Sequence, residues 1–348
     1  MIYPIHIGNQ LLSSASKILA PHIQGSQILI VTQKNIPGEY LSILQQQLKQ
    51  YQCDVIYLNA GESYKTLEEC QTIFSALLKN NHQRSTTLIA LGGGIVGDMT
   101  GFAAACYQRG VNYIQIPTTL IAQVDSSIGG KTGVNHALGK NMIGVFHQPQ
   151  CVLIDIDTLQ TLPEREFIAG MAEVIKYSLI HDAEFFDWLT NNIPAIRSKQ
   201  QDVLLSLIKT CVKHKLHFVM QDERDHGVRR LLNFGHTFGH AIETAFAYQD
   251  ILHGEAVAIG MMMAAQLSAQ LGFISEKEVA KITFLLAASG LNVTLKNPLD
   301  INQLIALMKK DKKRENNQSK FILLKAIGKA EEVAVDEGSL FKMALLHK

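Results

Sequence analysis

The sequence predicts an α/β domain with a Rossmann-like, mostly parallel sheet, followed by an all-α domain. Three observations lead to this fold class. At 348 residues the chain reaches the length at which a single hydrophobic core stops growing, so two domains are expected. Strand-type and helix-type patterns alternate through residues 1–157, as in a sheet with helices on both faces. From Pro163 onward the apolar period is helical, which gives a second domain at residues 158–348.

Continuous apolar runs of the buried-strand type mark the first domain, and residues 28–32 form the clearest one. The expected strands cover residues 2–7, 28–32, 53–58, 87–91, 113–116 and 151–156. The expected helices cover residues 10–20, 38–51 and 67–79 and an alanine-rich segment that ends at residue 106. Open α/β sheets bind ligands at the carboxyl ends of their strands, so the loop A-G-E-S-Y-K-T after residue 58 is a candidate ligand loop.

A glycine-rich turn, G-G-G-I-V-G-D, follows the strand at residues 87–91. Glycines between a buried strand and a helix let the backbone approach a phosphate, whose charge a helix N-terminus favours. The alternative is that the glycines only allow tight packing of the helix on the strand. The spaced G-x-G-x-x-G pattern is absent, so both interpretations stay open at this point.

Lysines, hydroxyls and glycines crowd into V-D-S-S-I-G-G-K-T-G-V-N and L-G-K-N-M-I-G, which lie between residues 124 and 144. This segment shows little regular periodicity and is richer in apolar residues than a linker. We therefore expect a long functional loop.

Helical periodicity fills the second domain. The expected helices cover residues 167–180, 185–190, 202–220, a histidine-rich segment, 257–271, 276–289 and 301–310. Near the end, residues 309–329 hold eight basic and two acidic side chains. This run is either a solvated face or a loop that returns to an anionic substrate.

The histidine-rich segment has the spacing of a metal site. If it is one helix, His236, His240 and Glu243 share a face, and His253 follows at a helix-breaking His-Gly. Imidazoles with a carboxylate from elsewhere, such as Glu173, suit an open zinc site. Spacing alone favours His236 and His240 as ligands, although a histidine on a helix is commonly an ordinary core or surface residue. The glutamate of H-E-x-x-H is absent, which argues against a protease-type zinc helix.

Composition excludes several classes of protein. The formal net charge of +1 argues against bulk binding to nucleic acid or a membrane surface. No stretch approaches the roughly 20 apolar residues of a membrane span, and the start of the chain lacks signal-peptide order. The five cysteines are scattered, without C-x-x-C, as expected of reduced thiols. We expect a soluble cytoplasmic protein.

Nine motifs, in order and at matching spacing, resemble the 3-dehydroquinate synthases of the shikimate pathway, which serves aromatic amino acid biosynthesis. They are G-E-S-Y-K, L-G-G-G-I-V-G-D, Y-Q-R-G-V, I-P-T-T-L, V-D-S-S-I-G-G-K-T, G-K-N-M-I-G, A-E-V-I-K-Y, L-L-N-F-G-H-T-F-G-H-A-I-E and H-G-E-A-V-A-I-G-M. The resemblance covers nearly the whole chain. It implies an NAD-binding α/β domain and a helical metal- and substrate-binding domain.

The resemblance also implies the metal and its ligands. The ion would be zinc, with cobalt as the other option, held by Glu173, His236 and His253. His240 would then face the substrate instead of the metal, and Glu243 would support a ligand from behind.

By the same resemblance, NAD would be bound by residues spread along the first domain and at the domain junction. They are Glu62, Lys65, Gly93, Gly94, Ile95, Val96, Gly97, Asp98, Thr118, Thr119, Asp125, Lys131, Lys140, Thr158 and Leu159. Two positions depart from the common pattern, Gln33 and Ala60, and both bear only on NAD affinity.

The phosphate and carboxylate of the substrate would meet a second set of side chains. They are Lys131, Asn141, Lys176, Lys215, Arg229, Asn233 and a lysine of the 309–313 run, Lys313. The arginine of Y-x-R-G, here Arg109, would reach a neighbouring subunit, so the resemblance implies a homodimer.

The implied reaction converts 3-deoxy-D-arabino-heptulosonate 7-phosphate to 3-dehydroquinate and phosphate, which makes the chain a lyase. Transient oxidation by NAD would acidify a proton, and β-elimination of phosphate, return of the hydride, ring opening and an aldol closure would follow. Lys131, Lys176 and Arg229 would act as electrostatic clamps.

Three alternatives remain. Another sugar phosphate cyclase, such as an inosose or valiolone synthase, would not need the carboxylate clamp of Lys215, Arg229 and Asn233. A polyol dehydrogenase of the same fold would release NADH and would not need the phosphate lysines. A silent metal- or NAD-binding regulatory domain would not need the complete ligand set.

Overall fold

The computed structural model describes residues 3–246, 251–295, 301–311, 319–336 and 338–340. Contacts divide the chain into two compact units. Unit 1 comprises Met1–Pro163 and Gln201–Met220, and unit 2 comprises Glu164–Gln200 and Gln221–Lys348. The sequence pattern predicted a single boundary at residue 157, and it did not include the return of Gln201–Met220 to the first unit.

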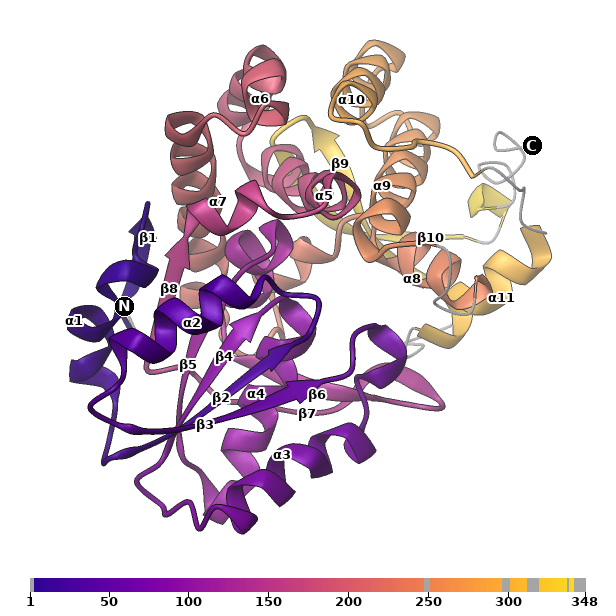
Figure 1. Ribbon diagram of the computed structural model, residues 1–348. Helices are drawn as coiled ribbons and strands as arrows, with labels where there is room; N and C mark the ends of the chain where they lie inside the picture. Colours follow the sequence, from indigo (N-terminus) through magenta and orange to yellow (C-terminus); the bar gives the residue numbers. More distant parts are fainter. Residues whose placement is uncertain (1–2, 247–250, 296–300, 312–318, 337, 341–348) are drawn as a thin grey trace. The chain divides into compact units, whose positions relative to one another are not determined.

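Unit 1 is built on a parallel six-stranded sheet, as predicted (Figure 1). Across the sheet the strands are β1 (Ile5–Gly8), β8 (Cys151–Asp155), β5 (Asn112–Pro117), β4 (Thr87–Gly92), β2 (Gln27–Gln33) and β3 (Gln52–Leu58). Every neighbouring pair is parallel, so all carboxyl ends share one edge of the sheet. That edge is the expected ligand side.

Helices cover both faces of this sheet. Since successive strand residues point to opposite sides, alternate side chains of one strand pack against different helices. Ile28 and Ile30 pack against one cluster of helices, and Leu29 and Val31 pack against the other. The first face is covered by α1 (Ala15–Leu19) and α2 (Gly38–Gln47). The second face is covered by α3 (Leu67–Lys79) and α4 (Gly94–Cys106). Burial on both faces explains the continuous apolar runs.

Unit 1 also contains short helical turns and one long helix. They are η1 (Leu12–Ser14), η2 (Ala20–His22), η3 (Glu62–Tyr64), η4 (Tyr107–Arg109), η5 (Ala122–Ser126), η6 (Ile156–Gln160) and α7 (Gln201–Gln221). The helix expected at residues 10–20 is broken into η1, α1 and η2. No side-chain cap supports α1, and Pro21 lies in the next turn.

The segment expected to be an irregular loop is an antiparallel hairpin of β6 (Lys131–His136) and β7 (Gly139–Phe146). Gly133 pairs with Gly144 across it, and a Cβ on Gly144 would collide with the carbonyl oxygen of Thr132. Glycines that permit this close approach also hide the alternation by which a strand is recognised, so the expectation of a loop was wrong.

Unit 2 is mainly helical, as predicted. Its helices are α5 (Glu164–His181), α6 (Ala183–Arg197), η7 (Val228–Asn233), α8 (His236–Ala245), α9 (His253–Gln270), α10 (Glu276–Ala288) and α11 (Ile301–Asp311). His236, His240 and Glu243 lie on one helix, α8, as predicted. Gly235 has a φ of 79° just before α8, and His253 opens α9 instead of following a helix end. Among the described residues, no helix is both long and apolar enough to span a membrane.

An antiparallel hairpin, β9 (Ser319–Ala326) with β10 (Lys329–Val335), corrects the all-α expectation for this domain. Phe321, Leu323 and Leu324 are buried, and the ring of Phe321 stacks on Phe238 of α8 at 5.2 Å between centroids. A short apolar run does not distinguish a strand from a helix, and the flanking lysines made the charge pattern the more prominent feature of this segment.

Candidate active site

Three ligand-type side chains of unit 2 meet at the start of two helices. His236 is the first residue of α8, His253 is the first residue of α9, and Glu173 lies inside α5. Oε1 of Glu173 is 3.5 Å from Nε2 of His236 and 3.4 Å from Nε2 of His253. This oxygen is buried and accepts no hydrogen bond from a described residue. The two ring nitrogens and the oxygen lie within 4.8 Å of one another, a spacing that one divalent ion could close.

The protonation states of Glu173 and His236 favour the binding of a cation. Burial alone would raise the pKa of Glu173, but the Lys176 ammonium and the imidazoles of His236 and His253 outweigh it and hold the pKa well below its usual range. Lys176 is also buried and forms an ion pair with Glu173. Burial lowers the pKa of His236 to about 3, against the pull of Glu173, so its imidazole is neutral. Metal ions bind the anionic carboxylate and the neutral imidazole, so the residues fit the implied ion.

Backbone and carboxylate partners orient both imidazoles. Nδ1 of His236 lies 3.2 Å from the Phe234 carbonyl oxygen, which leaves Nε2 to face Glu173. Nδ1 of His253 lies 3.2 Å from Oε1 of Glu243. Such contacts fix the tautomer and direction of a metal-binding histidine.

A second possible group, His240 with Glu243 and His253, shares a member with the first. His236 and His240, the pair that helical spacing predicted as ligands, therefore fall in different groups. The group that includes Glu173 agrees with the ligand set implied by the resemblance.

Unit 1 gathers several of the residues predicted to bind NAD or substrate. Nζ of Lys65 donates to Oδ2 of Asp98 at 2.6 Å and to Oδ1 of Asn141 at 2.5 Å. Burial raises the pKa of Asp98, and the Lys65 ammonium partly offsets this rise. The ligand loop, the glycine-rich turn and the β6–β7 hairpin are thus joined at one lysine.

Asn135, which the sequence motifs did not single out, joins the same network. Its Nδ2 donates to Oε1 of Glu62 at 2.9 Å, and its Oδ1 accepts from the backbone amide of Asn141 at 2.8 Å. Nζ of Lys140 lies 3.8 Å from Oε1 of Glu62. The sequence signal that could have indicated Asn135 is its position at the end of G-G-K-T-G-V-N. It lies two residues after Gly133, which pairs across the hairpin.

The glycine-rich turn serves close packing. A Cβ on Gly97 would lie 2.5 Å from Oε1 of Gln115, and one on Gly94 would lie 2.9 Å from Oγ of Ser126. Packing thus accounts for these two glycines. The start of α4 follows Gly93 and has no side-chain cap, so its first amides remain available to an anion. Ile95 is half-buried and Val96 is fully buried.

Other predicted cofactor residues surround this edge of the sheet. The amide of Thr118 donates to the Gly92 carbonyl oxygen at 3.0 Å, and Thr119 lies against Gly93. Thr158 and Leu159 are both buried in η6, where the Thr158 hydroxyl already bonds to the Asp155 carbonyl oxygen and Gln123. Their contact with NAD stays a prediction.

The predicted substrate residues are divided between the units. In unit 1, Nζ of Lys215 pairs with Oδ1 of Asp125 at 2.9 Å, and Lys131 is exposed at the start of β6. In unit 2, Arg229 and Asn233 lie on η7, where the buried Arg229 donates to the Glu223 carbonyl oxygen at 2.5 Å. Their roles stay predictions.

Two further predicted residues stand apart from these. Lys313 lies outside the described residues. Arg109 is exposed at the end of η4 with a φ of 73°, next to Gln108 with a φ of 46°.

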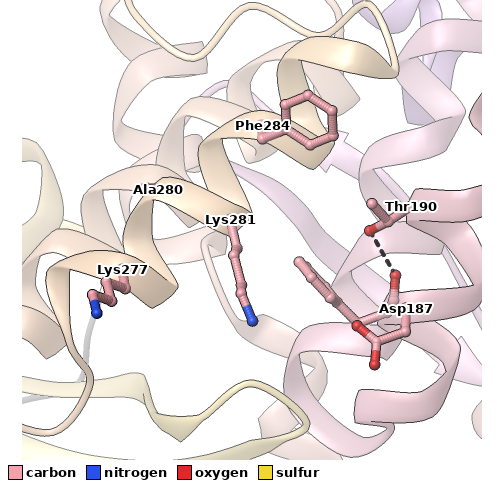
Figure 2. A pocket seen from close by; sticks show the side chains of 7 residues that line it. Asp187, Thr190, Lys277, Ala280, Lys281 and Phe284 are labelled. Carbon is pink, nitrogen blue, oxygen red and sulfur yellow. Dashed lines mark hydrogen bonds between the residues drawn. The ribbon is translucent and has the colours of Figure 1, made fainter.

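A separate pocket of about 340 Å³ lies between α6 and α10 of unit 2 (Figure 2). Phe186 and Phe284 contribute apolar lining. Figure 2 shows Lys277 and Lys281 on the α10 side. None of its lining residues is a predicted site residue, so we do not assign the reaction to it.

The fold and site define a class: enzymes that combine a parallel α/β unit with a helical unit bearing a two-histidine, one-carboxylate group. Two family models match consecutive parts of the chain, "3-dehydroquinate synthase N-terminal" over residues 55–169 and "3-dehydroquinate synthase C-terminal" over residues 170–314. A 3-dehydroquinate synthase of Shewanella pealeana is 54% identical over 329 residues, which cover 94% of this chain and 91% of that protein. The chain belongs to the 3-dehydroquinate synthase family.

Solved structures of other enzymes share this fold. The 2-epi-5-epi-valiolone synthase of Streptomyces hygroscopicus subsp. jinggangensis, solved with NAD+ and Zn2+, superposes with a TM-score of 0.91 at 30% identity and covers 99% of this chain and 96% of that one. A 2-deoxy-scyllo-inosose synthase, solved with carbaglucose-6-phosphate, NAD+ and Co2+, has a TM-score of 0.89 at 26% identity, with the same coverage.

Proposed function

We propose that this chain is a lyase that converts 3-deoxy-D-arabino-heptulosonate 7-phosphate to 3-dehydroquinate and phosphate. The observation that carries the proposal is the group of buried Glu173 with half-buried His236 and His253, in a chain that is 54% identical to a curated 3-dehydroquinate synthase. The cyclases with other products are 30% and 26% identical, so the comparisons favour the dehydroquinate reaction over these alternatives.

Glu173, His236 and His253 would hold a zinc or cobalt ion, and the loop around Lys65, Asp98 and the start of α4 would hold NAD. When bound, these groups supply a Lewis acid and a reversible hydride acceptor. The carboxylate oxygen of Glu173 that lacks a hydrogen-bond partner would be a ligand for the ion. The first amides of α4, which has no side-chain cap, would donate hydrogen bonds to a phosphate of NAD. The predicted NAD-binding and metal-binding residues lie in unit 1 and unit 2 respectively.

Two lysine side chains would bind the anionic groups of the substrate. Lys176, buried beside Glu173, keeps that carboxylate ionised and places a cation where substrate oxygens would bind. Lys131 is exposed at the start of β6 and is suited to the leaving phosphate. A lysine on a developing phosphate anion is expected to lower the barrier by roughly 3 kcal/mol.

We further propose a cytoplasmic homodimer. All five cysteines are free thiols, which suits a reducing compartment. The dimer is supported by Arg109, an exposed cation on a backbone turn with two consecutive positive φ values. Residues held in such conformations concentrate at functional sites.

The test is stoichiometric. Purified protein would receive the heptulosonate phosphate and NAD, and phosphate, carbocyclic product and reduced-cofactor absorbance would be followed together. Phosphate and 3-dehydroquinate are expected to form one for one, with no accumulation of NADH. A rise of NADH equal to product would assign a dehydrogenase and overturn the proposal.

A further inference from the structure

A second cluster of metal-ligating side chains lies in unit 1, apart from every residue assigned above. It consists of His6 in β1, His22 in η2 and Cys151 at the start of β8. Their ring nitrogens and sulfur lie within 4.8 Å of one another.

Sheet register explains why these residues meet. β1 and β8 are neighbouring strands (Figure 1). They run parallel, and His6 pairs with Leu153, two residues after Cys151. Residues two apart on a strand share a face, so His6 and Cys151 lie diagonally on one side of the sheet. Leu153 and Cys151 belong to the core under α1 and α2, and η2, which carries His22, directly follows α1.

The donor set suits a thiophilic ion. Around one tetrahedral zinc ion, nitrogen and sulfur donors lie about 3.3–3.6 Å apart, so small rotations of the imidazoles would close the present spacing. No hydrogen bond or ion pair joins either imidazole to another described side chain. Both histidines are half-buried, which leaves an entry path, while Cys151 is fully buried.

We propose that His6, His22 and Cys151 form a second metal site that binds a zinc ion, with water as the fourth ligand. Binding would displace the thiol proton of Cys151 into solvent and form a zinc–thiolate bond, with no change of oxidation state. Burial raises the pKa of this thiol to about 12, so affinity should rise with pH. Burial, with His6, lowers the pKa of His22, which keeps its lone pair available near neutral pH.

The site is separate from the proposed NAD-binding residues. Cys151 opens β8 and His6 is the second residue of β1, so the cluster lies toward the amino edge of the parallel sheet. The glycine-rich turn follows the carboxyl end of β4. We assign the ion a structural role because β1 has only four residues at the sheet edge, and the ion would fasten it to β8 and η2.

Cobalt distinguishes this site from the Glu173 group, because only a thiolate ligand gives a near-ultraviolet sulfur-to-cobalt charge-transfer band. The full chain, freed of metal by a chelator, would be titrated with Co2+ alone. We expect the band in the wild type and in His253→Ala, which removes the other site. Its absence at saturating cobalt in the wild type would overturn the proposal.

Variants assign the band to its ligands. Cys151→Ala should abolish it, whereas Cys70→Ala, a matched control at another fully buried cysteine, should retain it. His6→Gln and His22→Gln keep Cys151 in the core, and each should weaken cobalt binding more than roughly tenfold. Circular dichroism would confirm that each variant is folded. Persistence of the band in Cys151→Ala, or unchanged affinity in both histidine variants, would refute the site.

Discussion

His253 lies between two carboxylates in the proposed metal site. It faces a carboxylate at each ring nitrogen, Glu173 from Nε2 and Glu243 from Nδ1. The first carboxylate would share the metal with His253, and the second would fix its tautomer. His240 belongs to the alternative group and faces His236 edge to face at 5.5 Å between ring centroids.

We predict that His253→Ala loses bound zinc and activity, whereas His240→Ala retains the zinc and loses turnover. The first change removes one of three protein ligands, and the second leaves the Glu173 group intact. Metal analysis of the dialysed variants measures the difference, with His217→Ala as a control outside both groups. Zinc retained in His253→Ala and lost in His240→Ala would restore the ligand pair that helical spacing suggested.

His82 forms a second polar centre, buried in unit 1. Its Nδ1 lies 2.8 Å from Oγ1 of Thr86, and its Nε2 lies 3.0 Å from Oδ2 of Asp54. Its carbonyl oxygen accepts from the Tyr107 hydroxyl at 2.6 Å and from Nε2 of Gln108 at 3.2 Å. Burial lowers the pKa of His82 below 6.5, and the interaction with Asp54 only partly opposes this.

This lowered pKa predicts a pH dependence of stability. Below pH 6.5 the unfolded chain binds a proton at His82 that the folded chain does not, so the unfolding free energy falls as pH drops toward the folded pKa. His82→Gln should cost about 1–2 kcal/mol at pH 8, where the lost hydrogen bonds dominate. The difference in unfolding free energy between wild type and variant should be smaller at pH 5.5 than at pH 8. Urea unfolding at both pH values measures it, and a gap that is constant or widens would contradict the assignment.

The proposed metal ligands show how much of the candidate site the residue patterns could predict. Spacing indicated a metal in the histidine-rich segment and selected His236 with His240, which do lie one turn apart on a single helix, α8. The group that includes Glu173 instead combines the first residues of two helices, His236 and His253, with a carboxylate from a third. Position at a helix start cannot be read from periodicity, whereas the matched motifs proposed these three residues, whose role as ligands stays a prediction.

At the scale of elements, α4 is positioned by glycines that face β5 and the β6–β7 hairpin. A Cβ on Gly97 would lie 2.5 Å from Oε1 of Gln115, and one on Gly101 would lie 2.5 Å from Cγ2 of Thr132. Gln115 is buried, so it has little room to move. The same helix presents its uncapped start to the proposed cofactor.

Gly97→Ala should therefore lower the unfolding free energy by about 1–3 kcal/mol through overpacking. Because the helix would shift, NAD affinity should fall as well. Gly38→Ala is the matched control, since a Cβ at this first residue of α2 would meet no atom within 4 Å. Thermal unfolding and NAD titration report both effects. Equal stability of the two variants would show that Gln115 can move aside.

Elements whose apolar residues follow one clear helical or strand period were predictable. Elements in which glycines or charges obscure that period were not. The expected bounds of α3, residues 67–79, match the structure, because an amphipathic pattern follows a Thr66 side-chain cap. The β6–β7 and β9–β10 hairpins were missed. Their strands depend on pairing across a glycine contact or on burial against α8, and neither is a local property of the sequence.

At the scale of the whole molecule, the chain leaves unit 1 after Pro163 and returns for Gln201–Met220. Lys215 on this returning helix pairs with Asp125, a predicted NAD-site residue. A periodic pattern identifies the helix but carries no signal of the unit in which it packs. The path of the chain between the units was therefore not predictable. The α/β class of unit 1 was predictable, because it depends on the local alternation of strand and helix patterns.

The proposed homodimer gives the last prediction, which concerns Arg109. Tyr107 and Gln108 anchor its turn to His82, and Arg109 itself is exposed, so the turn holds a cation toward solvent. If this arginine serves the partner subunit's site, Arg109→Ala and Glu173→Ala should each be inactive alone but complementary in a mixed dimer. One site would then combine an intact ligand set from one chain with an intact arginine from the other.

Half of randomly mixed dimers would be heterodimers with one working site in two, so activity should recover to about a quarter of the wild-type value. Differently tagged chains and tandem purification would establish that subunits have exchanged. Mixing Glu173→Ala with His253→Ala is the control, because both changes damage the same ligand set and no intact site can form. If exchange is demonstrated and the Arg109→Ala mixture stays as inactive as this control, Arg109 acts within its own chain.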